Sequence, residues 1–275
     1  MQGKLFIVGT PIGNLGDMTP RAVDTLREAD FIAAEDTRVT VKLVNHFDIR
    51  TPMISTHEHN EQRRGHQIVA RILAGESCAL VTDAGMPCIS DPGGLVVKAA
   101  QEAGIEVVSV PGPSAAIAAL SIAGMDAARF CFEGFLSTAK AARREHLAEL
   151  RQERRTLVFY EAPHKLRATL GDMLSAWGDR EVALCREMTK RHEEVLRLSL
   201  FEAVAYYEAN EPRGEYVLVI AGAPPEEKRP LTTEEAINYA RSLLEEGTAP
   251  AEAAKRAAKE TGQPRSTIYK ALAEK

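Results

Sequence analysis

Short, fully apolar runs recur along the first 110 residues, and loops rich in glycine, proline and aspartate follow them. Such runs are typical of strands that are buried on both faces. The expected strands are Leu5–Val8, Phe31–Ala34, Met53–Ser55, Cys78–Val81 and Val107–Val110. Helical patterns separate the first four, with helices expected from Thr19-Pro20, over 39–47 and over 61–74. This alternation predicts an α/β fold with a mainly parallel N-terminal sheet.

The pattern changes after residue 112, where a second α/β lobe is expected. An apolar helix over 115–123 and a charged helix over about 140–155 come first. Strands are then expected at 157–160, 182–185, 195–198 and 216–220. The last three fit a mixed or antiparallel sheet better than repeated parallel units. The predicted domains are therefore 1–112 and 113–223, followed by a third unit.

The third unit, 230–275, follows a proline-rich linker at 223–230 and shows three short helical stripes. A glycine break before the last stripe resembles a helix-turn-helix motif. A helical cap that packs on the main body or on a partner subunit is an equally good interpretation.

The net charge of −5 and the pI near 5.9 argue against a protein that coats nucleic acid through bulk charge. Two segments are nevertheless basic. Residues 137–167 hold eight Lys and Arg against four Glu, and residues 250–275 hold six against three. Such runs are often solvated helix faces, but the pairs Arg143-Arg144 and Arg154-Arg155 favour a phosphate-binding surface.

The four cysteines form no C-x-x-C pair, and no run approaches membrane-spanning length. The first residues run directly into the short apolar stretch Leu5–Val8 and do not resemble a signal peptide. The expected setting is the reducing cytoplasm, with free thiols and no membrane association.

Three loops, at 9–17, 82–94 and 110–116, lie where ligands bind a parallel sheet, beyond the carboxyl ends of strands. None matches the phosphate-binding Gly-x-x-x-x-Gly-Lys-Ser/Thr motif or Gly-x-Gly-x-x-Gly. The second loop holds two aspartates and no Lys or Arg, so a cationic, hydroxylated ligand such as S-adenosylmethionine suits it better than a phosphate. Ordinary turns remain the alternative.

At these loops the sequence resembles the ribosomal RNA small subunit methyltransferase I family, 2′-O-ribose methyltransferases of the tetrapyrrole methylase superfamily. The matching stretches are 8–17, 33–38, 57–61, 83–94, 111–115, 132–136, 159–165 and 186–190. The resemblance implies a two-lobed fold with S-adenosylmethionine in the cleft between the lobes, and a homodimer. It also implies 2′-O-methylation of a cytidine in the decoding centre of 16S rRNA, on free RNA or in the small ribosomal subunit.

Residues that match the family's motifs are expected to bind the cofactor. They are Thr10, Pro11, Asp83, Ala84, Gly85, Met86, Ser114, Ala115, Tyr160 and Glu161. Small departures occur at Gly9, Met86 and Cys88, where the family often has Pro, Thr and Leu. Each keeps a small or apolar contact, so activity is expected to persist.

Two polar sets that follow strands are the catalytic candidates, since either could orient the 2′-hydroxyl group. The first is Glu35, Asp36 and Arg38, which could also be a helix cap with its arginine partner. The second is Glu187 and Lys190 beside Arg186, which could also be a surface ion pair. The sequence does not identify the general base. No metal site is expected, because His57-x-His59 is the nearest candidate and such positions diverge on a strand.

Two alternative functions remain at this point. A methyltransferase acting on a tetrapyrrole or corrin precursor would use the same fold. A non-enzymatic module that binds nucleic acid through the C-terminal helices would not need three ligand-type loops.

Overall fold

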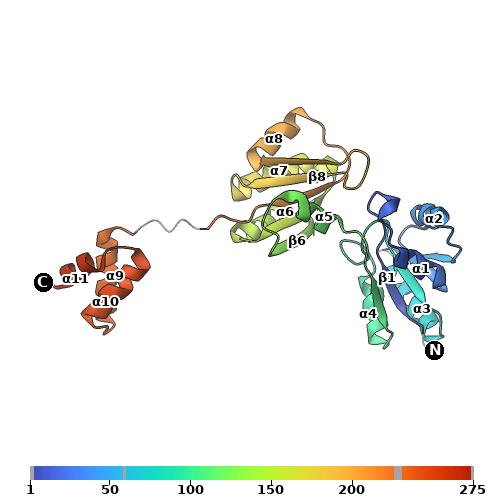
Figure 1. Cartoon of the computed structure of the whole chain (residues 1–275), viewed down its shortest axis with the longest axis horizontal. Coiled ribbons are helices and arrows are strands. Elements are labelled where there is room, and N and C mark those ends of the chain that lie inside the picture. The colour runs from blue at the N-terminus through green and yellow to red at the C-terminus, as the bar shows by residue number, and fades with distance from the viewer. Residues whose placement is uncertain (1–2, 58–59, 226–230, 274–275) are drawn as a thin grey trace. The chain divides into compact units, whose positions relative to one another are not determined.

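The computed structural model describes residues 3–57, 60–225 and 231–273 of the 275-residue chain. The chain divides into two compact units, Met1–Ala223 and Pro224–Lys275. The larger unit contains two five-stranded sheets with helices packed on them, and the smaller is helical (Figure 1). The expected α/β fold with a parallel and a mixed sheet is confirmed.

The N-terminal sheet is entirely parallel in its described pairs, with the strand order β3-β2-β4-β1-β5. Its strands are β1 (Leu5–Val8), β2 (Phe31–Ala34), β3 (Met53–Ser55), β4 (Cys78–Val81) and β5 (Val107–Val110). All five have the bounds predicted from the apolar runs. Since β4, β1 and β5 are neighbours, the loops that follow them emerge side by side.

Helices cover both faces of this sheet, in two pairs set by the strand order. The helices are α1 (Pro20–Glu28), α2 (Thr37–His46), α3 (Glu61–Leu73) and α4 (Gly94–Glu102). One hydrophobic cluster joins α1 and α2 to Val8, and another joins α3 and α4 to Leu5 and Ile7. Alternate residues of a strand point to opposite faces, which is why Ile7 and Val8 belong to different clusters.

The C-terminal sheet is mixed and has the strand order β6-β7-β10-β8-β9. Its strands are β6 (Phe130–Phe135), β7 (Thr156–Glu161), β8 (Glu181–Arg186), β9 (Glu194–Ser199) and β10 (Tyr216–Ile220). Only β6 and β7 pair in parallel, so the predicted mixed sheet is confirmed. Strand β6 was not predicted, because a glycine and a glutamate interrupt its aromatic residues.

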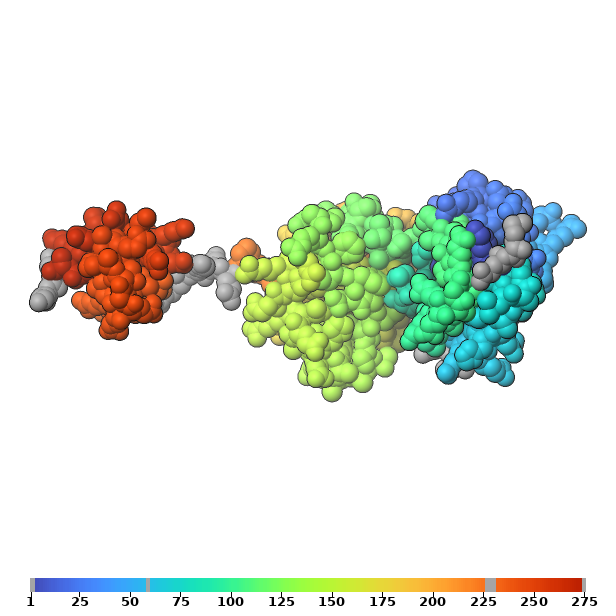
Figure 2. Space-filling model, turned by 90° about the horizontal axis from the view of Figure 1, so that it is seen from below, coloured from blue at the N-terminus to red at the C-terminus, as the bar shows by residue number. Residues whose placement is uncertain are grey.

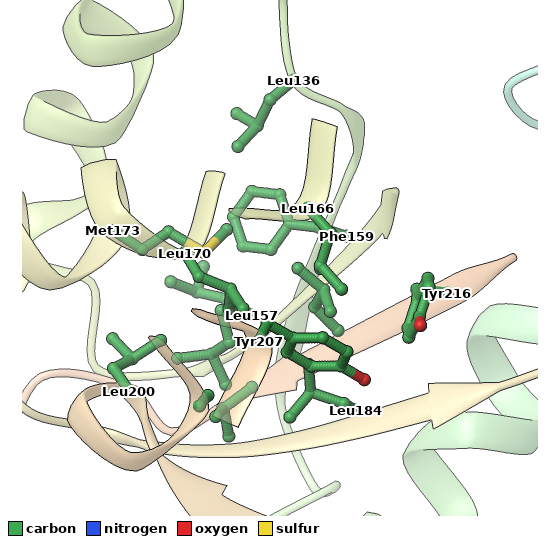
Figure 3. Close-up of a cluster of buried hydrophobic side chains, with 14 of the residues drawn as sticks. Leu136, Leu157, Phe159, Leu166, Leu170, Met173, Leu184, Leu200, Tyr207 and Tyr216 are labelled. Atoms are coloured by element: carbon green, nitrogen blue, oxygen red, sulfur yellow. The ribbon is translucent and has the colours of Figure 1, made fainter. Parts of the chain in front are cut away.

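One face of the C-terminal sheet packs against α5 (Ala115–Ala123). The other face packs against α6 (Lys140–Glu149), α7 (Pro163–Trp177) and α8 (Leu200–Ala209). Figure 3 shows Leu166, Leu170 and Met173 of α7 directed towards Phe159 on the sheet. Helices α4, α7 and α8 were not predicted from the sequence.

The basic segment before β7 differs from the predicted phosphate-binding surface. Helix α6 lies on the surface (yellow-green in Figure 2), but Arg143 on it is buried, with only 7% of its area exposed. Its guanidinium donates to Asp172 Oδ2 at 2.6 Å, and Arg144 donates to Oδ1 at 2.8 Å. The proposed role of Arg143 in phosphate binding is therefore wrong, since this arginine joins α6 to α7.

The other basic pair lies far from the carboxyl end of β7. Arg154 and Arg155 precede Thr156, the first residue of this six-residue strand. A strand rises about 3.3 Å per residue, so Glu161 at its other end is roughly 20 Å away. Arg155 also forms an ion pair with Glu153 at 2.6 Å.

The smaller unit consists of α9 (Thr233–Glu245), α10 (Pro250–Thr261) and α11 (Arg265–Ala273). Its core comprises Ala236, Ala240, Ala254, Ala257 and Ile268, which belong to the three predicted stripes. Residue Gly262 ends α10 with a positive φ of 72°, a conformation that favours glycine.

Across residues 3–57, 60–225 and 231–273, the helices are too short or too polar to pass through a lipid bilayer.

The buried ion pair between Arg143 and Asp172 gives a prediction about stability. Burial alone would raise the pKa of Asp172, but its bonds to Arg144 and Arg143 lower it overall, so the carboxylate stays ionised. We expect Asp172→Asn to lower the free energy of unfolding by about 3 kcal/mol, because it leaves the buried guanidinium without its counter-charge. Urea denaturation followed by circular dichroism measures this.

The matched control is Arg144→Gln, because that side chain is 57% exposed and bonds to the same carboxylate. The guanidinium of Arg144 is hydrated, and without it Asp172 keeps its bonds to the buried Arg143, so this variant should lose clearly less stability than Asp172→Asn. Equal losses in the two variants would contradict a special role for the buried pair.

Candidate functional site

A cavity of about 420 Å³ lies at the carboxyl ends of the N-terminal strands and is closed by the C-terminal sheet. Its walls come from both halves of the larger unit. The lining residues are Ile12, Ala84, Gly85, Met86, Ile89, Ser90, Asp91, Ser114, Ala115, Phe135, Tyr160, Glu161, Ala162, Pro163, Met188, Lys190, Glu215, Tyr216 and Val217. This volume falls within the range typical of small-molecule sites.

The loops after β1 and β4 are tied together by a pair of backbone hydrogen bonds. The amide of Thr10 donates to Gly85 O at 2.9 Å, and the amide of Gly85 donates to Thr10 O at 3.1 Å. The Thr10 hydroxyl also donates to Thr82 O at 3.1 Å. Thr10 therefore fixes the cavity wall from behind and does not face the cavity.

The loops after β1 and β5 approach so closely that both need glycine. A Cβ atom on Gly112 would lie 2.8 Å from the backbone of Gly9, closer than real Cβ atoms come to backbone. The contact brings the start of α5 against the first loop, where Ser114 and Ala115 line the cavity.

The aromatic side of the cavity is built on β6 and β7. The hydroxyl of Tyr160 accepts a hydrogen bond from the amide of Ala116 at 3.2 Å, and burial raises the pKa of this phenol. The rings of Phe132 and Phe135 lie 5.0 and 5.5 Å from that of Tyr160. A register shift in β6 at Gly134, which has a φ of 64°, precedes Phe135 at the cavity.

Backbone strain is concentrated in the two loops that face each other across the cavity. Residues Cys88 and Ser90 have φ values of 73° and 62°, and Glu187 and Thr189 have values of 52° and 65°. Residues other than glycine rarely adopt this region, and a β-branched residue there is an outlier. Such strain is typical of functional sites, where the surrounding structure enforces it.

The single lysine on the cavity wall is neutralised by two carboxylates. The ammonium group of Lys190 lies 2.9 Å from Glu187 Oε1 and 2.7 Å from Glu215 Oε2. Burial alone would lower the pKa of Lys190, but these two bonds raise it overall. The wall therefore carries no excess positive charge for a phosphate group.

The carboxylate of Glu161 is already occupied by the protein. It accepts hydrogen bonds from Thr169 Oγ1 at 2.5 Å and from the amide of Ala162 at 2.8 Å, and it pairs with Lys165 at 3.1 Å. With 2% of its area exposed, Glu161 holds β7 to the start of α7.

Seven of the ten residues expected at the cofactor line the cavity, namely Ala84, Gly85, Met86, Ser114, Ala115, Tyr160 and Glu161. The other three, Thr10, Pro11 and Asp83, lie outside its lining. Contact of any of the ten with a cofactor stays a prediction.

The first predicted catalytic set forms a cluster beside the cavity. Asp36 caps α2, accepting from the amide of Arg38, and pairs with its guanidinium at 2.6 Å. The amide of Asp36 donates to Asp83 Oδ1 at 3.2 Å, and the amide of Asp83 lies 3.4 Å from Glu35 Oε2. The helix-cap interpretation is thus satisfied, and the catalytic role of the set stays a prediction.

The second predicted catalytic set is divided between the cavity wall and its support. Lys190 lines the cavity, whereas Glu187 lies behind it and accepts from Lys190 and from the amide of Glu215 at 3.1 Å. In the histidine stretch, His57 bonds to Asn60, and Glu58 and His59 lie outside the described residues.

Asp91, Phe135 and Met188 line the cavity but were not predicted to, although each lies in a stretch that matches the family's motifs. Tyr216 and Val217 were not predicted either, because an ordinary buried strand gives no sequence signal for a site. In the part of the chain that the structure describes, no group of three or more His, Cys, Asp or Glu side chains could hold a metal ion.

Two solved structures share the fold at low sequence identity. Uroporphyrin-III-C-methyltransferase from Thermus thermophilus superposes with a TM-score of 0.58 and 21% identity, over 80% of this chain and 94% of that one. Diphthine synthase gives a TM-score of 0.62 and 13% identity, over 80% and 90%.

Relatives found by sequence share a much higher identity with this chain. The ribosomal RNA small subunit methyltransferase I of Synechocystis sp. is 50% identical over 97% of this chain and 96% of its own length. That of Bacillus subtilis is 42% identical over 98% and 94%. The profile of the Tetrapyrrole (Corrin/Porphyrin) Methylases matches residues 4–204. The chain thus belongs to the ribosomal RNA small subunit methyltransferase I family, within the tetrapyrrole methylases.

Proposed function

We propose that this protein transfers a methyl group from S-adenosylmethionine to the ribose 2′-oxygen of a cytidine in the decoding centre of 16S rRNA. The observation that carries the proposal is the near full-length identity of 42–50% to relatives named for methylation of small-subunit rRNA. Such similarity extends over the loops of the cavity, where the chemistry would take place.

The cavity suits S-adenosylmethionine in its size and in its charge. Apolar walls from Ile12, Met86 and Met188 can accept the adenine ring, and Ser114 offers a hydroxyl for the polar tail. The ammonium of Lys190 is balanced by two carboxylates, so a cationic sulfonium meets no net repulsion there. The cofactor supplies a methyl group on an already activated carbon.

The protein's own task is then alignment and proton removal. Methyl transfer is an in-line displacement, so the acceptor oxygen must be held opposite the sulfur. We place the RNA ribose beside Glu35, Asp36 and Arg38, which border the cavity, and assign Lys190, held by Glu187, to orient the reacting groups from the opposite wall.

The protein is proposed to act in the cytoplasm, on 16S rRNA or the small ribosomal subunit, and to form a homodimer. Exposed basic residues of the segment 137–167, such as Arg151 and Arg154, are proposed to contact phosphates at a distance from the cavity. This replaces the role that the sequence had suggested for Arg143.

Filling the cavity should weaken cofactor binding. Residue Ala115 lines the cavity on the first turn of α5, so Ala115→Phe places a ring where the cofactor is proposed to lie. We expect its affinity for S-adenosylmethionine, measured by isothermal titration calorimetry, to fall at least about tenfold, equivalent to 1.4 kcal/mol.

The control is Ile117→Phe, on the same helix but with 53% of its area exposed. This variant should bind the cofactor like the wild type, and both should melt at similar temperatures. Undiminished binding by Ala115→Phe would mean that the cofactor lies elsewhere.

The substrate can be identified with radiolabelled cofactor and three acceptors. These are naked 16S rRNA, assembled small subunits and a tetrapyrrole precursor. We expect label in rRNA, on free RNA or on the assembled particle. The labelled nucleotide should have a 3′-phosphodiester bond that resists alkaline hydrolysis, because its 2′-oxygen is methylated. Label in the tetrapyrrole alone would overturn the proposed function. The prediction that S-adenosylmethionine binds in the cavity would remain valid, because the titration tests it separately.

A further inference from the structure

Asp91 lies at the border between the cavity and the acidic cluster formed by Glu35, Asp36 and Asp83. Its side chain belongs to the cavity lining, together with Ile89 and Ser90 of the same loop. Glu35 and Asp83 lie near enough for their charges to act on it, and its own charge acts on Tyr160 of the same lining. A group that takes a proton from a ribose beside the bound cofactor would have to lie at such a border.

The backbone on both sides of Asp91 is fixed. Ser90 has a φ of 62°, and Pro92 has a fixed φ of its own and restricts the backbone of Asp91 before it. The amide of Gly93 donates to the buried carboxylate of Glu61 at 2.9 Å, and the amide of Cys88 donates back to Pro92 O at 3.3 Å. These restraints fix the position of the Asp91 backbone in the loop.

The other carboxylates of the cavity wall are committed to internal partners. Glu161 is bonded to Thr169, Ala162 and Lys165, and Glu215 is paired with Lys190. By contrast, none of the residues 3–57, 60–225 and 231–273 forms a hydrogen bond or ion pair with the Asp91 carboxylate. Its lone pairs are open to a ligand in the cavity.

We propose that Asp91 is the general base of the methyl transfer, a role that rests on the proposed function. One oxygen of its carboxylate accepts the proton of the ribose 2′-hydroxyl group. At the same time the 2′-oxygen forms its bond to the methyl carbon and the bond from sulfur to that carbon breaks. The electron pair of the broken bond stays on sulfur, which becomes a neutral thioether, so charge and atoms balance.

The surroundings of Asp91 adjust its basicity to this role. Burial, followed by the charges of Glu35 and Asp83, raises its pKa to about 6. The other titratable side chains of the cavity lining are Tyr160, Glu161, Lys190, Glu215 and Tyr216. The carboxylate is ionised above this pKa and accepts protons better than an ordinary aspartate, so methyl transfer should rise as the pH increases through about 6.

The test compares the wild type with Asp91→Asn and Asp91→Glu in single-turnover methylation of the rRNA acceptor. A general base contributes about 100- to 10,000-fold, so Asp91→Asn should lower the rate constant by that range. Its affinity for S-adenosylmethionine and its melting temperature should match the wild type. The rise in rate near pH 6 should disappear, and Asp91→Glu should recover part of the rate because it keeps a carboxylate.

Asp24→Asn is the control, since Asp24 is 66% exposed on α1 and only 3.8 Å from Arg27 in a surface pair. It should behave like the wild type throughout. The proposal is wrong if Asp91→Asn keeps the wild-type rate and its pH dependence. It is also wrong if that variant loses cofactor affinity and keeps its rate at saturating cofactor, because the carboxylate would then bind the cofactor. A wild type without activity on rRNA would refute the proposed function instead.

Discussion

The placement of β1 between β4 and β5 is the constraint on which the rest of the site depends. Three loops follow these neighbouring parallel strands, so they meet at one edge of the sheet. The paired amides of Thr10 and Gly85, and the close approach of Gly9 to Gly112, then fix them relative to one another. The cavity walls contributed by Gly85, Ser114 and Ala115 follow from that contact.

The C-terminal sheet completes the cavity and adds its own strained loop. Thr189 keeps a left-handed backbone although its side chain is β-branched, and its neighbours Met188 and Lys190 reach the cavity. A Cβ atom on Gly13 would lie 2.5 Å from the Lys190 side chain, so the first loop of the chain packs directly on this one. The two halves thus position each other's residues.

Much of the fold could be predicted from the sequence. The five strands of the N-terminal sheet are continuous apolar runs, so their bounds could be predicted. The N-cap residue Thr19 and the following Pro20 predicted the start of α1. Helix α4 was missed because it begins inside a glycine-rich loop. Leu166, Leu170 and Met173 of α7 have helical spacing, so the sequence contains the pattern that predicts this helix.

The site could be predicted only where its signal is local. Gly85 and Ser114 lie in conspicuous loops, whereas Val217 is an ordinary strand residue whose position in the cavity depends on the pairing of β10 with β7 and β8. Likewise, charge alone could not separate buried Arg143 from exposed Arg154, because the partner Asp172 lies 29 residues along the chain. Burial is a property of the folded chain, not of a run of like charges.

The two exposed apolar side chains at the cavity have a calorimetric consequence. Ile89 and Phe135 are 48% and 53% exposed; Ile89 lies in the loop after β4 and Phe135 on β6. A ligand that covers both removes apolar surface from water, which makes the heat capacity of binding more negative. The temperature dependence of the binding enthalpy would therefore report how far a ligand bridges the two halves of the protein.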